Sequence, residues 1–130
     1  ELPALVRSAR DGRGVAVAYD GVGRATFDAS LASLRRRGML VLFGGSSGQV
    51  PPVDLQRLNA GGSLFVTRPT LADYTATPQE LSARAHELFS AVADGALTLH
   101  IGARFDLGDA AAAHAALEGR ATTGKVILTL

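Results

Sequence analysis

Met39-Leu40-Val41-Leu42-Phe43 is an unbroken apolar run, and it ends in Gly44-Gly45-Ser46-Ser47-Gly48. A strand that is apolar on both faces is typical of a parallel sheet with helices on each side. Two similar runs flank it along the chain, Val15-Ala16-Val17-Ala18-Tyr19 and Ser63-Leu64-Phe65-Val66-Thr67. Segments with helical spacing of apolar residues separate the three runs. This order predicts an α/β fold in which right-handed crossovers join three parallel strands.

Helix signals surround these strands. Apolar spacing predicts a helix over residues 2–9, and Thr26 is the expected cap of a second helix that Gly38 ends. The arginine run 35–37 would then lie at the C-terminus of this second helix, as a solvated group that complements the helix dipole. Asp54 is expected to begin a short third helix.

The later part of the chain contains the clearest helix start. Thr77-Pro78-Gln79-Glu80 is a capping box with proline at the first helical position, and Gly95 ends this helix. Residues 97–101 alternate between apolar and polar side chains, which predicts a half-buried strand. An alanine-rich helix capped by Asp109 and a final strand over residues 125–130 complete the pattern.

Composition and charge narrow the function classes. The 130 residues carry 13 Lys and Arg against 12 Asp and Glu, and this net charge of +1 leads us to expect no nucleic-acid partner. The chain has no cysteine, which excludes disulfides and thiolate zinc sites within it. No apolar run approaches the roughly 20 residues that span a bilayer, and the first residues do not resemble a signal peptide. We therefore expect a cytoplasmic protein without a membrane partner.

Ligands of open parallel sheets bind beyond the carboxyl ends of the strands. Three such ends lie at residues 20–23, 43–48 and 67–69. Their glycines allow a ligand to approach the main chain closely, although glycine also serves simply to turn a strand into a helix. Thr26 occupies the third glycine position after Gly21-Val22-Gly23, so this loop does not complete a dinucleotide fingerprint. The three ends define where a ligand would bind but not which one.

Charged residues and histidines leave the ligand open as well. Arg68 directly follows a buried strand, where it could contact a phosphate or remain a solvated charge. Arg120 follows the glycine that ends a helix, where a cation more simply serves the helix C-terminus. The three histidines lie far apart with no partner at metal-ligand spacing, so we predict no metal site. The residues by themselves identify no catalytic group.

Several segments, in order and with matching gaps, resemble one family. They are Val17-Ala18-Tyr19-Asp20-Gly21-Val22-Gly23, Phe43-Gly44-Gly45-Ser46-Ser47-Gly48, Gly62-Ser63-Leu64-Phe65-Val66-Thr67-Arg68-Pro69 and Leu117-Glu118-Gly119-Arg120. Over essentially its whole length the chain resembles the NADPH:quinone oxidoreductase branch of the zinc-independent medium-chain dehydrogenase/reductases, the zeta-crystallin-like group. The resemblance implies a two-domain enzyme of which this chain is the C-terminal part, without the glycine-rich pyrophosphate loop.

The resemblance also implies a division of the chain and a cofactor site. Residues 1–95 would be the later half of a Rossmann-type doubly wound parallel sheet, and residues 96–130 would return to a GroES-like catalytic domain. The cofactor-binding residues carried over position by position are Phe43, Gly44, Gly45, Ser46, Val66, Thr67, Arg68 and Arg120. Residues 43–46 would line the nicotinamide half of NADPH. Gly45 stands where some relatives carry a polar side chain.

The activity that the resemblance implies is hydride transfer from NADPH directly to a bound quinone, with the protein supplying position and electrostatics. The isolated chain would be inactive. Two alternatives remain, a non-catalytic α/β association module and an enone or aldehyde reductase of the same superfamily. The family often dimerises by pairing its last sheet strand, here Ser63 to Thr67, and such pairing protects an apolar edge. We therefore expect a homodimer.

Overall fold

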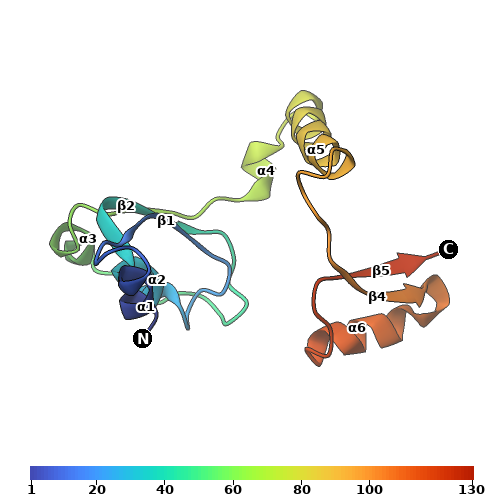
Figure 1. Cartoon of the computed structure of the whole chain (residues 1–130), viewed down its shortest axis with the longest axis horizontal. Helices are drawn as coiled ribbons and strands as arrows, with labels where there is room; N and C mark the ends of the chain where they lie inside the picture. The colour runs from blue at the N-terminus through green and yellow to red at the C-terminus, as the bar shows by residue number, and fades with distance from the viewer. The chain divides into compact units, whose positions relative to one another are not determined.

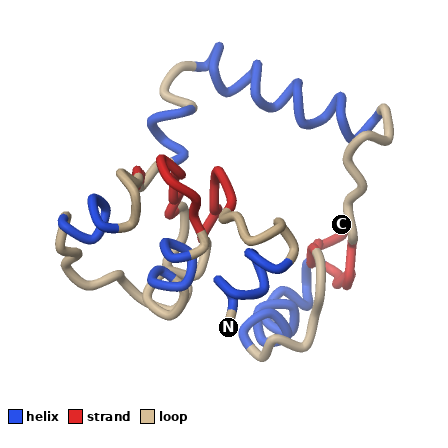
Figure 2. Tube along the Cα trace, turned by 60° about the vertical axis from the view of Figure 1, so that its left-hand side comes forward, coloured by secondary structure: helices blue, strands red, loops and turns tan.

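The structure is a computed structural model that describes residues 1–130. The chain forms two compact units, Glu1–Thr75 and Ala76–Leu130. Figure 1 follows both units along the chain, and Figure 2 separates helices (blue) from strands (red). None of the helices combines the length and the apolar character that a bilayer crossing requires.

The first unit contains a parallel sheet in the spatial order β1-β2-β3. Its elements in chain order are α1 (Leu2–Ser8), β1 (Val15–Asp20), α2 (Phe27–Ala32), β2 (Leu34–Leu42), α3 (Gln56–Ala60), β3 (Phe65–Thr67) and α4 (Leu71–Tyr74). Both strand pairs are parallel, which confirms the predicted three-stranded arrangement. The segments that follow the three strands therefore leave the sheet at the same edge.

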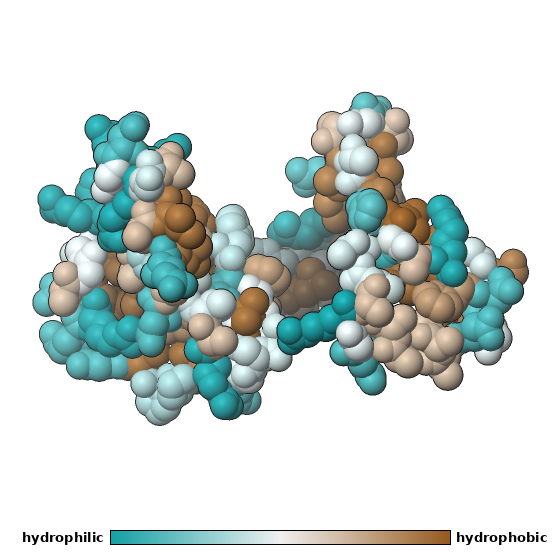
Figure 3. Space-filling view, turned by 60° about the horizontal axis from the view of Figure 1, so that its bottom comes forward, coloured by the Kyte–Doolittle hydropathy of each residue, from teal (hydrophilic) through white to brown (hydrophobic).

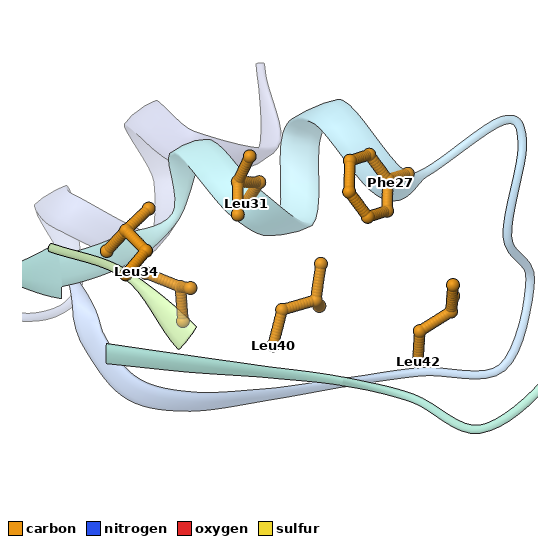
Figure 4. Packing of buried hydrophobic residues seen from close by; sticks show 6 residues of the cluster. Phe27, Leu31, Leu34, Leu40 and Leu42 are labelled. Atoms are coloured by element: carbon orange, nitrogen blue, oxygen red, sulfur yellow. The ribbon is translucent and has the colours of Figure 1, made fainter. Parts of the chain in front are cut away.

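One face of this sheet packs against helix α2. Phe27, at the start of the helix, points toward Leu42 at the end of β2 (Figure 4). Leu31, one turn later, points toward Leu40, which is completely buried (Figure 4). Removing a leucine side chain of this kind from water stabilises a fold by about 1.5–3 kcal/mol. This small core holds the carboxyl end of β2 against the helix that follows β1.

The opposite face of the sheet is apolar but exposed. The strand register places Val17 beside Met39 and Met39 beside Phe65, so these three side chains share a face. Their exposed fractions are 41%, 38% and 55%. Apolar side chains, drawn in brown, are open to view on the surface in Figure 3. The strands were predicted to be buried on both faces, and in this structure only the α2 side is buried.

Helix α2 is shorter than predicted. The helix expected from Thr26 to Gly38 has Thr26 as its first flanking residue but ends at Ala32, and β2 begins two residues later. The arginine run 35–37 is exposed, as predicted, but it lies on the strand and not at a helix C-terminus. The predicted helix-capping role of these arginines is therefore wrong.

Two hydrogen bonds end the helix before the arginines. The hydroxyl of Ser33 donates to the carbonyl of Ala29 at 2.7 Å, which closes the last turn. The Ser33 carbonyl in turn accepts the N–H of Val15 at 3.0 Å, which draws the chain alongside β1. Leu34 then pairs with Val15 and is buried. Burial of Leu34 in the sheet outweighs the helical spacing that the sequence shows.

The second unit contains the predicted capped helix and a parallel strand pair. Its elements are α5 (Pro78–Ala93), β4 (Ile101–Asp106), the 3₁₀ turn η1 (Leu107–Asp109), α6 (Ala110–Glu118) and β5 (Lys125–Thr129). The N–H of Glu80 donates to the Thr77 hydroxyl at 3.2 Å, and the N–H of Thr77 donates to the Glu80 carboxylate at 3.1 Å. These bonds confirm the capping box. Helix α6 connects β4 to β5 and packs on both strands (Figure 1).

The strand predicted over residues 97–101 is displaced. Strand β4 begins only at Ile101, where pairing with Lys125 of β5 begins. Leu97, four residues before β4, instead donates its N–H to the carbonyl of Ala91 at 2.8 Å, near the end of α5. An alternating segment becomes a strand only where a partner strand is present. Strand β5 begins at Lys125, which pairs with Ile101, so residues 97–100 have no partner strand.

Candidate cofactor site

Two loops at the carboxyl edge of the first sheet are bonded to each other. We name them the β1 loop (residues 21–26) and the β2 loop (residues 43–49). The Ser47 N–H donates to the Val22 carbonyl at 2.9 Å, and the Ser47 hydroxyl donates to the same oxygen at 2.6 Å. The Ser47 hydroxyl also accepts the N–H of Ala25 at 3.0 Å. A single serine thus joins the two loops through three hydrogen bonds.

Glycines make this close approach possible. A Cβ atom at Gly44 would collide with the carbonyl of Gly21. Gly23 has a φ of +89°, and a Cβ there would lie 2.9 Å from the carbonyl oxygen of Gly48. Residues with side chains rarely adopt that φ and would not fit the contact. The glycines predicted to let a ligand approach therefore serve first to let the two loops approach each other.

Beneath the β1 loop lies a buried carboxylate, Asp20, the last residue of β1. One carboxylate oxygen accepts the N–H groups of Val22 and Gly23, at 2.9 and 3.0 Å. The hydroxyl of Thr26 donates to both oxygens at 2.8 Å, and the hydroxyl of Ser30 donates to the second oxygen at 2.8 Å. Only 3% of Asp20 is exposed. The sequence pattern places Asp20 at the start of a turn and does not indicate this role.

Asp20 is held as an anion although it is buried. Burial favours the neutral acid, but the hydrogen bonds from Gly23, Ser30, Thr26 and Val22 together outweigh it, so the pKa of the Asp20 carboxyl lies below its ordinary value. All four donor groups are uncharged. The negative charge at this edge of the sheet therefore depends on donors that the β1 loop and helix α2 bring together.

The structure brings seven of the eight predicted cofactor residues to this edge. Phe43, Gly44, Gly45 and Ser46 form the first half of the β2 loop, Val66 and Thr67 end β3, and Arg68 follows. Strands β2 and β3 are neighbours, so these residues occupy adjacent positions on the sheet edge. The eighth residue, Arg120, is exposed beyond the end of α6 in the second unit.

Two hollows lie at this edge. The first, of about 660 Å³, is mainly apolar and has Phe43 and Thr67 in its lining together with Tyr19. The second, of about 550 Å³, is lined in part by Gly44, Gly45 and Arg68. Five of the predicted residues thus line one hollow or the other. The sequence did not predict Tyr19 as a lining residue, since in the pattern it is simply one residue of a buried strand.

Val66 and Arg68 lie differently from their neighbours. Val66 pairs with Leu40 and lines an apolar hollow together with Phe27, so its side chain is on the α2 side of the sheet. Arg68 donates from Nη1 to the main-chain carbonyl of Leu42 at 3.0 Å. The guanidinium therefore links the ends of β3 and β2, while the residue remains exposed at the second hollow.

Comparison with known proteins identifies the family to which the chain is similar. The sequence model of the family described as zinc-binding dehydrogenase matches residues 3–128. A quinone oxidoreductase of Pseudomonas aeruginosa is 47% identical over 118 residues, which are 91% of this chain and 36% of that protein. A 2-haloacrylate reductase of a Burkholderia species is 40% identical, over 98% of this chain and 39% of its own length.

A solved structure confirms the predicted fold class. A mycobacterial protein in complex with NADPH superimposes on 99% of this chain with a TM-score of 0.90 and 53% sequence identity. The match covers 40% of that protein. The chain therefore spans well under half the length of the relatives it matches.

Zinc is part of the family's description, and the residues of this chain do not form a site for it. The chain has no cysteine, and no three of its histidine, aspartate and glutamate residues are grouped so that they could hold one metal ion. The matched family and the shared fold extend over nearly the entire chain. This chain belongs to the zinc-binding dehydrogenase family.

Proposed function

We propose that this chain is the cofactor-binding, C-terminal portion of an NADPH-dependent quinone reductase. The observation that carries the proposal is the bonded pair of loops at the carboxyl edge of the sheet, in a chain 53% identical to a protein that was solved with NADPH. This edge is where open α/β sheets bind nucleotides. The name of the Pseudomonas aeruginosa relative supports a quinone as hydride acceptor.

The β2 loop fits a flat ring. Gly45 is exposed, and the only atom near the position of its missing Cβ is the carbonyl oxygen of Gly48, at 3.6 Å. A planar ligand can therefore contact the main chain at Gly45 without meeting a side chain. When bound, NADPH supplies the hydride. The chain contributes the position of the ring, through the β2 loop, and an adjacent cation, Arg68, that can bind an anionic or carbonyl group.

Parts of this proposal concern regions beyond the two loops. Residues 96–130 would return to a catalytic domain, and Arg120 would reach the cofactor from there. The edge position of β3, with Phe65 and Val66 exposed, supports a homodimer formed through this strand. We also propose a cytoplasmic location, which the absence of cysteine supports.

The experiment compares two polypeptides. One is this 130-residue chain, and the other, the extended polypeptide, joins it to the part of the relatives' sequence that this chain does not cover. NADPH fluorescence is titrated with each. We expect binding by the extended polypeptide and at least about tenfold weaker binding by the chain alone, because the β1 loop lacks a dinucleotide fingerprint. Equal affinity of the two would contradict the proposal that this chain carries only the nicotinamide side of the site.

A second candidate is an enone-type reductase, which the 40% identity to a 2-haloacrylate reductase supports. Both reactions use the same loops, and they differ in the acceptor. Competing quinone and 2-chloroacrylate in one assay with the extended polypeptide distinguishes them. The quinone reductase proposal predicts the higher kcat/KM for the quinone.

A further inference from the structure

We propose that Asp20 is a positioning residue for the nicotinamide side of the cofactor site. Its buried carboxylate holds the β1 loop in the conformation in which the carbonyls of this loop accept hydrogen bonds from the N–H groups of the β2 loop. The inference builds on the proposed function, because that proposal assigns the β2 loop to the cofactor. Asp20 itself lies beneath the loops and is 3% exposed, so it acts through them and not by touching a ligand.

Three consecutive carbonyl groups, from Asp20 at the end of β1 and from Gly21 and Val22 in the β1 loop, accept hydrogen bonds from the β2 loop. The carbonyl of Asp20 accepts the N–H groups of Phe43 and Gly44, at 3.0 and 3.3 Å. The next carbonyl, that of Gly21, accepts the N–H of Ser46 at 3.5 Å. The carbonyl of Val22 follows with its two bonds from Ser47. Three consecutive carbonyls thus receive most of the N–H groups of the β2 loop.

The orientation of two of these carbonyls depends on the Asp20 side chain. The Asp20 carboxylate accepts the N–H groups of Val22 and Gly23, so it fixes the peptide planes that carry the Gly21 and Val22 carbonyls. Hydrogen bonds to a carboxylate are about twice as strong as those between neutral groups. The same anion is held from the other side by the hydroxyl of Thr26, the last residue of the β1 loop, and by the hydroxyl of Ser30 on helix α2. The carboxylate therefore connects the packed helix to the ladder that supports the β2 loop.

Ser30 distinguishes this positioning role of Asp20 from simple local stabilisation of the β1 loop. The Ser30 hydroxyl donates its hydrogen bond to the Asp20 carboxylate and not to the β2 loop. If Ser30 influences Ser47, the influence must pass through Asp20. Residue Asp28 offers a matched control, because it is an exposed aspartate in the same helix whose carboxylate pairs with Arg57.

The experiment measures amide hydrogen exchange in the 130-residue chain with Asp20→Asn, Ser30→Ala and Asp28→Asn. In Asp20→Asn we expect the amides of Phe43, Gly44, Ser46 and Ser47 to exchange about tenfold faster. Ser30→Ala should accelerate the same amides by a smaller factor, and Asp28→Asn should leave them unchanged. Amides in helix α5, in the other unit, provide the internal reference. Faster exchange confined to Val22 and Gly23 overturns the proposal. If Asp20→Asn does not fold, Ser30→Ala decides alone, because it keeps the carboxylate.

Kinetics of the extended polypeptide complete the test. Asp20→Asn should raise the KM for NADPH several-fold and leave the KM for the quinone unchanged, because the β2 loop is assigned to the nicotinamide. Asp20→Ala, which removes the carboxylate that accepts from all four donor groups, should have the larger effect. Faster exchange with an unchanged KM for NADPH overturns the proposal. Failure of the wild-type extended polypeptide to oxidise NADPH instead overturns the proposed function, and the exchange rates still show whether Asp20 holds the β2 loop.

Discussion

The guanidinium of Arg68 donates a hydrogen bond to the main-chain carbonyl of Leu42 at 3.0 Å. The bond joins the residue after β3 to the last residue of β2, across the sheet edge where both strands end. Sequence considerations left two roles open for Arg68, a phosphate ligand and a solvated charge. The structure adds a third, since the arginine supports the strand end from which the β2 loop begins.

Arg68→Ala should therefore affect both the stability of the fold and the affinity for the cofactor. Loss of the bond to the Leu42 carbonyl should lower the free energy of unfolding by about 0.5–1.5 kcal/mol, measured by urea denaturation. In the extended polypeptide the KM for NADPH should rise. Arg35→Ala is the control, because Arg35 is an exposed arginine near the start of β2. Equal effects of the two substitutions would show that Arg68 is only a solvated charge.

Replacing the adjacent glycines Gly44 and Gly45 by alanine should have very different effects on stability. Gly44→Ala places a methyl group against the Gly21 carbonyl and should lower the free energy of unfolding by about 1–3 kcal/mol. Gly45→Ala places the same group at an ordinary van der Waals distance, 3.6 Å, from the carbonyl oxygen of Gly48, and it should leave the free energy of unfolding within about 0.5 kcal/mol of wild type. Urea denaturation of both variants tests the contact between the loops. A large loss at Gly45 and none at Gly44 would contradict the geometry described.

The contribution of Asp20 to stability should depend on pH. Its pKa is lowered in the folded chain, so the carboxylate stabilises the fold above the unfolded pKa, and this contribution is lost as pH falls through the folded pKa. The difference in unfolding free energy between wild type and Asp20→Asn should be constant near neutral pH. It should shrink below about pH 4, the ordinary range for an aspartate. A difference that persists unchanged in acid would mean that the charge of Asp20 does not contribute.

Dimer formation through β3 can be tested by substitutions on the exposed face of the sheet. Phe65 and Val17 lie in the same row of side chains on opposite edge strands, both exposed. Phe65→Glu should shift the chain toward monomer in sedimentation velocity experiments, because it places a charge beside the proposed pairing edge. Val17→Glu should not. A monomeric wild-type chain, or equal effects of the two variants, would remove the support for this interface.

The strands and the sheet edge that carries the two loops were predictable from the sequence because buried parallel strands have a local signature. The apolar run 39–43 and its glycine-rich continuation identify β2 and its loop without further information. The capping box at Thr77 and Glu80 is equally local, since its hydrogen bonds join residues three positions apart. These features depend on neighbours in the sequence.

Features that depend on convergence in three dimensions were missed. Helix α2 ends early because Leu34 pairs with Val15, which is 19 positions away and invisible to helical periodicity. Asp20 is held as a buried anion because hydroxyls six and ten residues later reach its carboxylate, from Thr26 just before helix α2 and from Ser30 on that helix. A signal was available there. Hydroxyl residues four apart at the start of a helix share a face, and they follow an aspartate at a strand end.

The proposed role of this chain in an NADPH-dependent quinone reductase is tested most directly by steady-state kinetics. The assay follows the oxidation of NADPH by the extended polypeptide with a simple quinone as acceptor. We predict quinone-dependent loss of NADPH absorbance, a raised KM for NADPH in Arg68→Ala and Asp20→Asn, and wild-type behaviour in Arg35→Ala and Asp28→Asn. A correctly folded extended polypeptide that oxidises no NADPH with any simple quinone would contradict the assignment.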